Sequence, residues 1–347
     1  MSQAHWVTTW FHQDSKITEG RYANVGANSS DQYVQNVYWR CVYGFFHSSI
    51  RVNPEAKHVL FTNARNLPIV DGVCFRAALE QLGVLVVFLE YTFSPPPEYP
   101  KNWRNQFYVF DCIKWFRENA AADDIVGLFD SDIVWLKPLS KISEGMSEGS
   151  VMAYDMRYPV DKDIHGLTLN DSKELYRELG VDLGGQAPKY YGGEFFLCEF
   201  SALEGLIEAV KFGWSESMRR WSIGETFFTE EAHVLSFAYS QSERDIHDLS
   251  VYAKRIWTSF KGYNNSSESD LDLVMWHLPS EKRFGFRRYY AAVRRKPTLF
   301  DGVPQSEFVR YLSRVMNVPR MTVKNRVMNY VEHVLWKAKG IVRRGVW

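Results

Sequence analysis

Residues 125–135 read Ile-Val-Gly-Leu-Phe-Asp-Ser-Asp-Ile-Val-Trp, and this stretch decides the fold. Its first five residues carry no polar side chain, which is typical of a short strand buried on both faces of a parallel sheet. The strand ends in Asp130 and Asp132, whose side chains point the same way if the chain stays extended. Ligands of open parallel sheets bind beyond the carboxyl ends of the strands. We therefore expect these two carboxylates to converge on a ligand.

Two carboxylates that converge on one point repel each other unless a cation lies between them. Oxygen ligands favour Mn²⁺ or Mg²⁺, and these ions commonly keep coordination positions for the phosphates of a nucleotide. The sequence therefore predicts that Asp130 and Asp132 bind Mn²⁺ or Mg²⁺. The alternative is a solvated turn, because Asp-x-Asp triplets are common by chance.

The composition limits the classes of function. The 347 residues carry a formal net charge of zero, so no overall attraction to nucleic acid is expected. The four cysteines lack CxxC spacing, which argues against structural zinc and favours free thiols in a reducing compartment. The first residues lack a signal-peptide pattern, and the longest apolar run, residues 82–89, is too short to span a bilayer. We expect a cytoplasmic protein that binds no nucleic acid.

The order of elements predicts the fold class. Strands are expected at residues 6–12, 57–63, 84–91, 125–129, 151–155, 190–200, 251–260 and 273–278. Helices are expected at residues 33–49, 73–82, 105–119, 171–179, 202–212 and 229–240. Strands that alternate with helices predict an α/β fold with a mostly parallel central sheet flanked by helices. A boundary near residue 300 is expected to separate a domain at 1–300 from a helical, basic extension at 301–347.

A second informative stretch, residues 190–196, reads Tyr-Tyr-Gly-Gly-Glu-Phe-Phe. Gly192 and Gly193 let the backbone approach a ligand closely. Tyr190 and Tyr191 offer flat faces and hydroxyl groups that suit sugar rings, and Glu194 adds a carboxylate. The alternative is an ordinary turn that enters a buried strand.

Two later stretches add candidate groups. Glu231 lies at the start of a predicted helix, where acidic residues also serve simply as partners of the helix dipole. His277 ends an apolar strand and would complete a mixed nitrogen and oxygen site with the two aspartates. The alternative for His277 is an ordinary core or surface residue. Basic residues follow it and would neutralise a diphosphate, namely Lys282, Arg283, Arg287 and Arg288.

These stretches resemble motifs of the nucleotide-sugar glycosyltransferases with the GT-A fold. Asp130-Ser131-Asp132 resembles their DxD motif. Residues 190–196 are similar to the YYGGAFF stretch of the histo-blood-group A/B and α-1,3-galactosyltransferase family, with Glu194 where that family has Ala. Residues 230–234 resemble that family's DESHL, whose Glu is the candidate nucleophile, and residues 60–63 resemble its VFTD.

Residues 277–283 resemble a different group, the glycogenin-like transferases, which carry an HxxGxxK motif. Ser280 stands where that motif has Gly, and Arg283 stands where it has Lys. The three departures, at Glu194, Ser280 and Arg283, leave the donor sugar and the third metal ligand open.

The resemblance implies metal-dependent transfer of a sugar from a UDP-sugar donor to an acceptor hydroxyl, with retention, in the synthesis of bacterial surface polysaccharide or glycan. Glu231 and Glu194 are the expected catalytic residues, and the acceptor is expected to be a glycan or a lipid-linked molecule. The expected donor-binding residues are Thr8, Thr9, Trp10, Phe11, Asn63, Arg104, Ser131, Lys282 and Arg283. The expected residues for the sugar or acceptor are Asp155, Tyr190, Tyr191, Gly192, Gly193 and His233.

Three rival functions use similar residues. A sugar-phosphate nucleotidyltransferase is disfavoured, because its GxGxRLxP opening is absent. A nucleotide-sugar hydrolase and a non-catalytic glycan-binding protein both remain alternatives.

The last segment, residues 320–347, holds seven Lys/Arg and one Glu, with apolar residues at helical spacing. This pattern predicts a basic amphipathic helix. Such a helix either makes peripheral contact with the inner face of the membrane or packs on its own domain.

Overall fold

A computed structural model describes residues 3–16, 19–22, 27–100, 102–242, 246–260 and 262–344. Its centre is a seven-stranded sheet in the order β12-β10-β11-β8-β1-β4-β7. In that order the strands are β12 (Ile246–Asp248), β10 (Val151–Asp155), β11 (Tyr191–Glu199), β8 (Ile125–Phe129), β1 (His5–Phe11), β4 (Lys57–Thr62) and β7 (Leu85–Phe88). Strands β8, β1, β4 and β7 are parallel, and β11 runs antiparallel to both of its neighbours. The predicted α/β class with a mostly parallel central sheet is confirmed.

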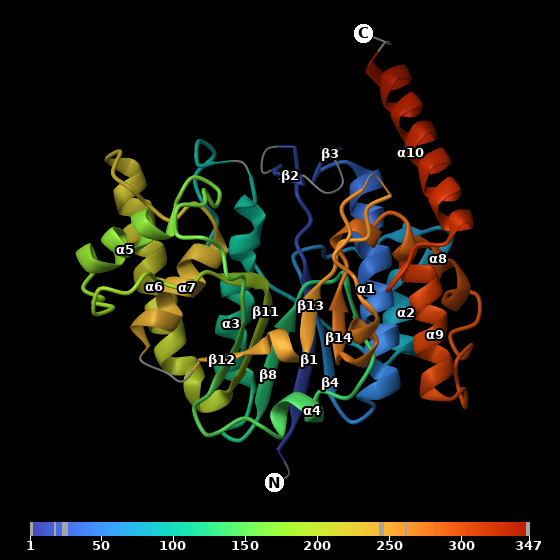
Figure 1. Ribbon diagram of the computed structural model, residues 1–347, viewed down its shortest axis with the longest axis horizontal. Helices are drawn as coiled ribbons and strands as arrows, with labels where there is room; N and C mark the ends of the chain where they lie inside the picture. Colours follow the sequence, from blue (N-terminus) through green and yellow to red (C-terminus); the bar gives the residue numbers. More distant parts are fainter. Residues whose placement is uncertain are drawn as a thin grey trace.

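Helices cover both faces of this sheet (Figure 1). One face carries α1 (Gln32–Val52), α2 (Phe75–Gln81), α8 (Gly285–Val293) and α9 (Gln305–Met316). The other carries α3 (Tyr108–Asn119), α6 (Phe200–Ser222) and α7 (Glu231–Gln241), with α5 (Leu169–Glu178) outside them. The remaining helices are α4 (Ser140–Ser143), α10 (Val323–Arg344) and the 3₁₀ turns η1 (Arg104–Phe107), η2 (Leu249–Val251), η3 (Glu268–Asp272) and η4 (Pro279–Glu281).

Strand β8 is buried on both faces, as its sequence predicts. Ile125 and Phe129 pack into the hydrophobic core on one side of the sheet, and Val126 and Leu128 pack into the core on the other. A Cβ on Gly127 would lie 2.7 Å from the ring tip of Phe129 and 3.1 Å from a backbone oxygen of Trp6, so only glycine fits between them. This packing fixes the end of β8, where the acidic residues follow.

Three strands form a second small sheet that the alternation of elements does not predict. It consists of β13 (Ala253–Arg255), β14 (Met275–His277) and β9 (Ile133–Trp135). The strands predicted at 251–260 and 273–278 are therefore much shorter than expected. Two further pairs are β2 (Arg21–Tyr22) with β3 (Ala27–Asn28), and β5 (Ile69–Val70) with β6 (Val73–Cys74).

The helix predicted at 202–212 is longer than expected and extends through α6. No proline interrupts it, and it ends just before Gly224, whose φ of 74° breaks the helical conformation. None of the helices that the structure describes is both long and apolar enough to cross a membrane.

The segment after residue 300 shares a core with the rest of the chain. Phe308, Leu312 and Met316 of α9 belong to the same buried cluster as Trp135 of β9. By contrast, α10 extends away from the body of the molecule beyond α8 (Figure 1).

Candidate active site and metal centre

Strand pairing places the candidate metal ligands together. Asp130 and Asp132 lie in the turn that joins β8 to β9, so the expectation of extended chain through these residues is wrong. Strand β14 pairs antiparallel with β9 so that His277 lies opposite Ile133. The backbone N–H of Leu278 donates to the carbonyl oxygen of Asp132 at 2.9 Å. His277 therefore lies beside Asp132 even though 145 residues separate them.

The three side chains gather around one point. One ligand atom from each of Asp130, Asp132 and His277 lies within 4.8 Å of the others. This spacing is close to that expected around one ion, because two ligands on opposite sides of Mg²⁺, each at ~2.1 Å, lie ~4.2 Å apart. The Asp132 and His277 side chains are almost fully buried, with 1% and 4% of their surface exposed, whereas Asp130 is 21% exposed and faces the opening.

The charges around this point are strongly coupled. Burial and the neighbouring Asp132 raise the pKa of Asp130 to about 6. Burial opposes ionisation of Asp132, but Lys282 and His277 outweigh it and hold the pKa of Asp132 below its usual range. Burial lowers the pKa of His277 and the carboxylates of Asp132 and Glu194 raise it, with a net result of about 9. The cluster is thus held together by charge.

The donor set fits a hard divalent cation. His277 Nε2 lies 3.0 Å from Asp132 Oδ2, and Lys282 Nζ lies 3.2 Å from Asp132 Oδ1. No hydrogen bond of good geometry reaches either carboxylate oxygen of Asp132 or either ring nitrogen of His277 from the described residues. Two carboxylates and one imidazole with unsatisfied buried atoms suit Mn²⁺ or Mg²⁺.

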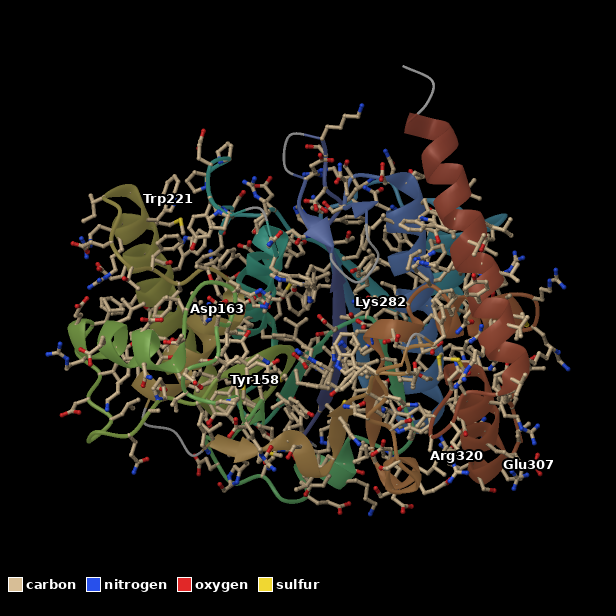
Figure 2. All side chains as sticks on the ribbon, turned by 45° about the horizontal axis from the view of Figure 1, so that its top comes forward. Tyr158, Asp163, Trp221, Lys282, Glu307 and Arg320 are labelled. Carbon is tan, nitrogen blue, oxygen red and sulfur yellow. The ribbon has the colours of Figure 1, made fainter. Side chains whose placement is uncertain are left out.

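A cavity of about 240 Å³ opens beside this cluster. Asp130, His277 and Lys282 form part of its lining, and aromatic side chains form another part, namely Trp103, Tyr158, Tyr190 and Trp257. In Figure 2 the top of the molecule as seen in Figure 1 comes forward. Tyr158 and Lys282 lie near the middle of this view, on segments far apart in the sequence. Flat aromatic faces beside charged groups suit the rings and hydroxyls of a sugar.

A smaller cavity of about 20 Å³ adjoins the first and shares Gln106, Asp130 and Lys282 with it. Its other lining residues are Trp10, Phe11, His12, Tyr38, Ser131 and Asp132. The structure therefore brings the predicted Trp10, Phe11 and Ser131 to the candidate metal ligands.

The paired glycines of β11 make room for two carboxyl groups. A Cβ on Gly192 would overlap Oε2 of Glu194 and lie 2.9 Å from its Cδ. A Cβ on Gly193 would overlap Oε1 of Glu231 and lie 3.3 Å from its Cδ. The glycines therefore leave the volume that these two carboxyl groups fill.

Glu231 begins α7 and lines the larger cavity. It is 6% exposed, and its Oε2 has no hydrogen-bond partner among the described residues. Burial first, and then the neighbouring Glu230, raise the pKa of Glu231 well above its usual range. A strongly perturbed carboxyl in a cleft is a candidate functional group.

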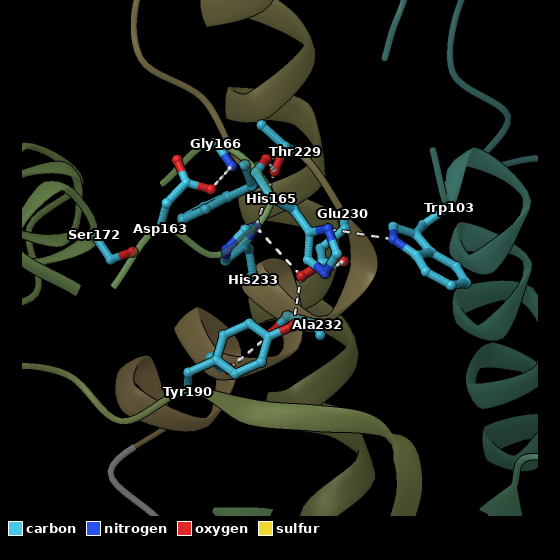
Figure 3. Close-up of polar contacts among 12 residues, drawn as sticks. Trp103, Asp163, His165, Gly166, Ser172, Tyr190, Thr229, Glu230, Ala232 and His233 are labelled. Carbon is cyan, nitrogen blue, oxygen red and sulfur yellow. Dashed lines mark hydrogen bonds and ion pairs between the residues drawn. The ribbon is translucent and has the colours of Figure 1, made fainter. Parts of the chain in front are cut away.

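Glu230 belongs to a second polar group beside the cavity (Figure 3). Its carboxyl accepts a hydrogen bond from the Tyr190 hydroxyl, and its Oε2 lies 3.6 Å from His165 Nε2. Trp103 Nε1 in turn donates to His165 Nδ1 at 3.3 Å. Burial raises the pKa of Glu230 to about 7. The nearby His233 is almost fully buried, and burial lowers its pKa to about 3.

Sequence reasoning missed several residues that line the larger cavity. Trp103 and His165 have left-handed backbones, with φ of 61° and 52°, a feature that no sequence pattern indicates here. Arg255 lies opposite His277 in the pairing of β13 with β14. The available signal for Arg255 is its charge inside the strand predicted at residues 251–260.

Several predicted donor-binding residues lie outside both cavities. The hydroxyls of Thr8 and Thr9 donate to carbonyl oxygens of β8 at 2.7 Å, so both side chains are used inside the sheet. Arg104 donates to the carbonyls of Pro95 and Pro96 and holds the proline-rich loop. Asn63 accepts from the backbone N–H of Gln13 at 2.6 Å.

Of the remaining predicted residues, some lie at the cavities and others lie outside them. Lys282 contacts Asp132, whereas Arg283 stacks on Trp336 with its guanidinium carbon 4.3 Å from the ring centroid. Of the predicted residues for the sugar or acceptor, Tyr190 and Gly193 line the larger cavity. The others lie outside the described linings of both cavities, namely Asp155, Tyr191, Gly192 and His233.

Comparison with known proteins adds structural likenesses of low identity. No protein-family model and no curated protein matches the sequence. The chain is similar to mouse xyloside xylosyltransferase 1 in its apo form, with a TM-score of 0.43, 10% identity, and coverage of 80% of this chain and 98% of that one. It is similar to an active-site mutant of LgtC, with a TM-score of 0.44, 13% identity, and coverage of 78% and 86%. Neither likeness identifies a substrate or an activity for this chain.

Proposed function

We propose that this chain is a metal-dependent glycosyltransferase that moves a sugar from a UDP-sugar to an acceptor hydroxyl. The observation that carries the proposal is the meeting of Asp130, Asp132 and His277 beside a cavity whose lining includes aromatic rings and Glu231. The motif resemblance of the same residues to GT-A transferases supports it. Mn²⁺ is the proposed ion, and Mg²⁺ is the alternative.

The proposed donor extends across the two adjoining cavities. The nucleoside is proposed to lie against Trp10 and Phe11, where the smaller cavity must widen because its 20 Å³ holds only about one water molecule. The shared wall at Asp130 and Lys282 is proposed to take the diphosphate. The sugar and the acceptor hydroxyl are proposed to occupy the larger cavity, whose lining includes the rings of Trp103 and Trp257, and such rings support a glycan or lipid-linked sugar as the acceptor. A role in bacterial surface polysaccharide or glycan synthesis is consistent with such an acceptor.

The proposed reaction exchanges one bond at the anomeric carbon for another. The bond from this carbon to the diphosphate oxygen breaks, and its electron pair leaves with UDP. The acceptor oxygen forms the new bond, and its proton passes to the leaving diphosphate. A bound divalent ion supplies Lewis-acid stabilisation of the leaving diphosphate, and Lys282 adds positive charge beside it.

Glu231 is the carboxyl group proposed to face the reacting carbon. Positive charge that develops on the sugar favours the ionised form of this carboxyl, against the effect of burial. Attack by Glu231 on the side opposite the leaving group inverts the anomeric carbon, and displacement of Glu231 by the acceptor inverts it again. Stabilisation of the charged sugar on that side leaves the acceptor to enter from the side of the leaving group, so both routes give retention. We propose retention on this basis and on the resemblance of residues 230–234 to the DESHL motif.

A donor screen tests the proposed function. The native chain is incubated with Mn²⁺, a panel of nucleotide sugars and glycan acceptors, and release of UDP and the glycosylated product are both measured. We expect product with at least one UDP-sugar and loss of it in Glu231→Gln, whereas Glu307→Gln on the exposed side of α9 leaves the rate unchanged. Sugar released only to water would favour a hydrolase, and UDP binding without turnover would favour a non-catalytic protein.

We propose peripheral membrane contact through α10 as part of this function. Apolar side chains are exposed along this helix at helical spacing, namely Val323, Val327, Tyr330, Val331, Val334 and Leu335. Residues 320–347 also hold seven basic residues and one acidic residue. The base of the helix is docked, because Asn329 accepts from Arg288 Nη1 at 2.7 Å. An anionic lipid surface matches both the apolar stripe and the positive charge.

Vesicle binding tests the membrane contact. The native chain should sediment with vesicles that contain phosphatidylglycerol and remain free of pure phosphatidylcholine vesicles. Val327→Asp with Val331→Asp should abolish sedimentation, whereas Ile223→Asp, at an exposed position after α6, should not. Failure of the native chain to bind anionic vesicles contradicts the proposal, and a dimer seen by light scattering would instead assign the stripe to a second copy.

A further inference from the structure

Glu194 lies in β11 with its carboxylate enclosed by two basic partners. Its side chain is 2% exposed. Arg255 Nε donates to Oε1 and Arg255 Nη2 donates to Oε2, each at 2.6 Å, so the ion pair is bidentate. On its other side, Oε1 lies 3.4 Å from His277 Nδ1. Both carboxylate oxygens are therefore engaged by the protein.

The ring of His277 lies between two carboxylates. Nδ1 faces Glu194, and Nε2 faces Asp132 at 3.0 Å. A neutral imidazole carries one N–H, and the partner of that N–H decides which nitrogen keeps the lone pair. Nδ1 lies 3.4 Å from Oε1 of Glu194, so a proton kept on Nδ1 and directed at this carboxylate leaves the lone pair on Nε2, the nitrogen that faces the two aspartates. Metal-bound histidines usually have such a carboxylate or carbonyl partner on the second nitrogen.

The backbone around Glu194 is arranged for this contact. The N–H of Asp130 donates to the Glu194 carbonyl oxygen at 3.0 Å, which places the turn of Asp130 and Asp132 beside β11. Gly192 leaves the volume that the Glu194 carboxylate fills. The rings of His277 and Phe195 form a T-shaped pair, with ring centroids 5.8 Å apart at 87°. These contacts leave the His277 ring little freedom to turn.

Arg255 explains how a further carboxylate is tolerated here. Four carboxyl-bearing residues line the larger cavity, namely Asp130, Glu194, Glu230 and Glu231. A free Glu194 would repel the others and would compete for the ion. With both oxygens held by the guanidinium, Glu194 is neutralised and turned toward the histidine.

We infer that Glu194 is a positioning residue, which Arg255 holds in place and which orients His277 so that Nε2 faces the ion bound by Asp130 and Asp132. This inference rests on the proposed metal site and replaces the catalytic role that the sequence predicts for Glu194. Glu194 acts through the histidine, because Arg255 already holds both of its carboxylate oxygens.

Metal affinity measured without turnover tests the inference. Mn²⁺ is titrated into the native chain and into Glu194→Gln in the presence of UDP, with free Mn²⁺ followed by electron paramagnetic resonance. We expect affinity to fall ~10- to 100-fold, as is typical when the partner of a metal-binding histidine is removed. Glu199→Gln is the matched control, because Glu199 lies on the same strand but accepts from the backbone of Gly149.

A double-mutant cycle separates positioning from general electrostatics. If Glu194 acts through His277, then Glu194→Gln adds no further loss of Mn²⁺ affinity to His277→Ala. Additive losses, unchanged affinity in Glu194→Gln, or no Mn²⁺ binding by the native chain would each overturn the inference. Arg255→Lys, which keeps the charge but removes the bidentate contact, gives a second variant if Glu194→Gln does not fold, and we expect a smaller loss.

The inference and the proposed function fail in different ways. Mn²⁺ binding that weakens in Glu194→Gln, in a native chain that turns over no nucleotide sugar, would support the positioning role and reject the transferase. Turnover by the native chain with equal Mn²⁺ affinity in the variant would do the reverse.

Discussion

Gly193 and Glu231 share one volume at the wall of the larger cavity. A methyl group on Gly193 would overlap Oε1 of Glu231, whose side chain is buried. The carboxyl must therefore move if the methyl is present. The glycine controls where the candidate catalytic group lies.

Gly193→Ala should consequently lower the turnover number ~100-fold, because a displacement of ~1 Å at a reacting centre is enough for such a loss. Donor affinity, measured by titration with UDP, should change little. Gly205→Ala is the control, since Gly205 lies within α6 with no atom within 4 Å of an added Cβ. Native turnover in Gly193→Ala would show that Glu231 is not required at its observed position.

His58 is a buried histidine in β4 whose Nε2 lies 3.0 Å from the Ser49 hydroxyl. Burial lowers its pKa to about 4 from the ordinary 6.5. His58 is therefore protonated below about pH 6.5 in the unfolded chain but only below about pH 4 in the folded chain. The stability present above pH 6.5 is lost as the pH falls through this window, by up to about 3 kcal/mol.

In His58→Gln this part of the acid sensitivity should disappear. Denaturant unfolding at pH 7 and pH 4.5 measures it, and the difference in unfolding free energy between the two pH values should be smaller in the variant than in the native chain. An identical difference in both proteins would show that His58 does not contribute.

At the scale of elements, the turn η4 is joined to helices α8 and α9 by the fully buried Glu281. Its carboxylate accepts from the Thr258 hydroxyl, from Asn317 Nδ2 at 2.8 Å and from the backbone N–H of Gly285 at 2.9 Å. Arg288 Nη2 lies 3.5 Å away. Glu281 precedes Lys282, so the same carboxylate fixes the segment that carries Lys282 to Asp132.

Glu281→Ala should lower the free energy of unfolding by ~3–5 kcal/mol, because it leaves several buried donors and one cation without their partner. Chemical denaturation measures the loss. Glu307→Ala, at an exposed position of α9, should stay within ~0.5 kcal/mol of the native chain. A small effect of Glu281→Ala would mean that water replaces the carboxylate at this junction.

Local patterns predicted the elements that depend on local sequence. The apolar run before Asp130, the helix that includes Phe116 and the alternation of strands with helices all identify the class of fold. Partners distant in sequence were not predictable. The pairing of β14 with β9 and the position of Arg255 beside Glu194 follow from long-range packing, which one sequence without relatives does not reveal.

In the candidate site too, some residues were predictable from the sequence and others were not. Asp130, Asp132 and His277 carry a chemical signal, a set of metal-binding side chains at strand ends, and the structure brings them together. Thr8 and Arg104 were placed at the donor by their position in the chain, but hydrogen bonds to carbonyl groups use both side chains elsewhere. Trp103 and His165 reach the cavity through left-handed backbone conformations that their sequence does not indicate.

At the scale of the whole molecule, one cavity collects acidic side chains from segments far apart in the sequence. Asp130 follows β8, Glu194 lies in β11 and Glu231 begins α7. Asp132 is the most buried of the three candidate ligands. Its replacement by Asn removes the charge while the shape of the side chain is kept. The central claim is that these residues bind one divalent cation.

The most direct test is a Mn²⁺ titration of the native chain and of Asp132→Asn in the presence of UDP, with free Mn²⁺ followed by electron paramagnetic resonance. We expect one Mn²⁺ bound per native chain and loss of that binding in the variant. Equal binding by the two proteins, or no binding by the native chain, would contradict the claim.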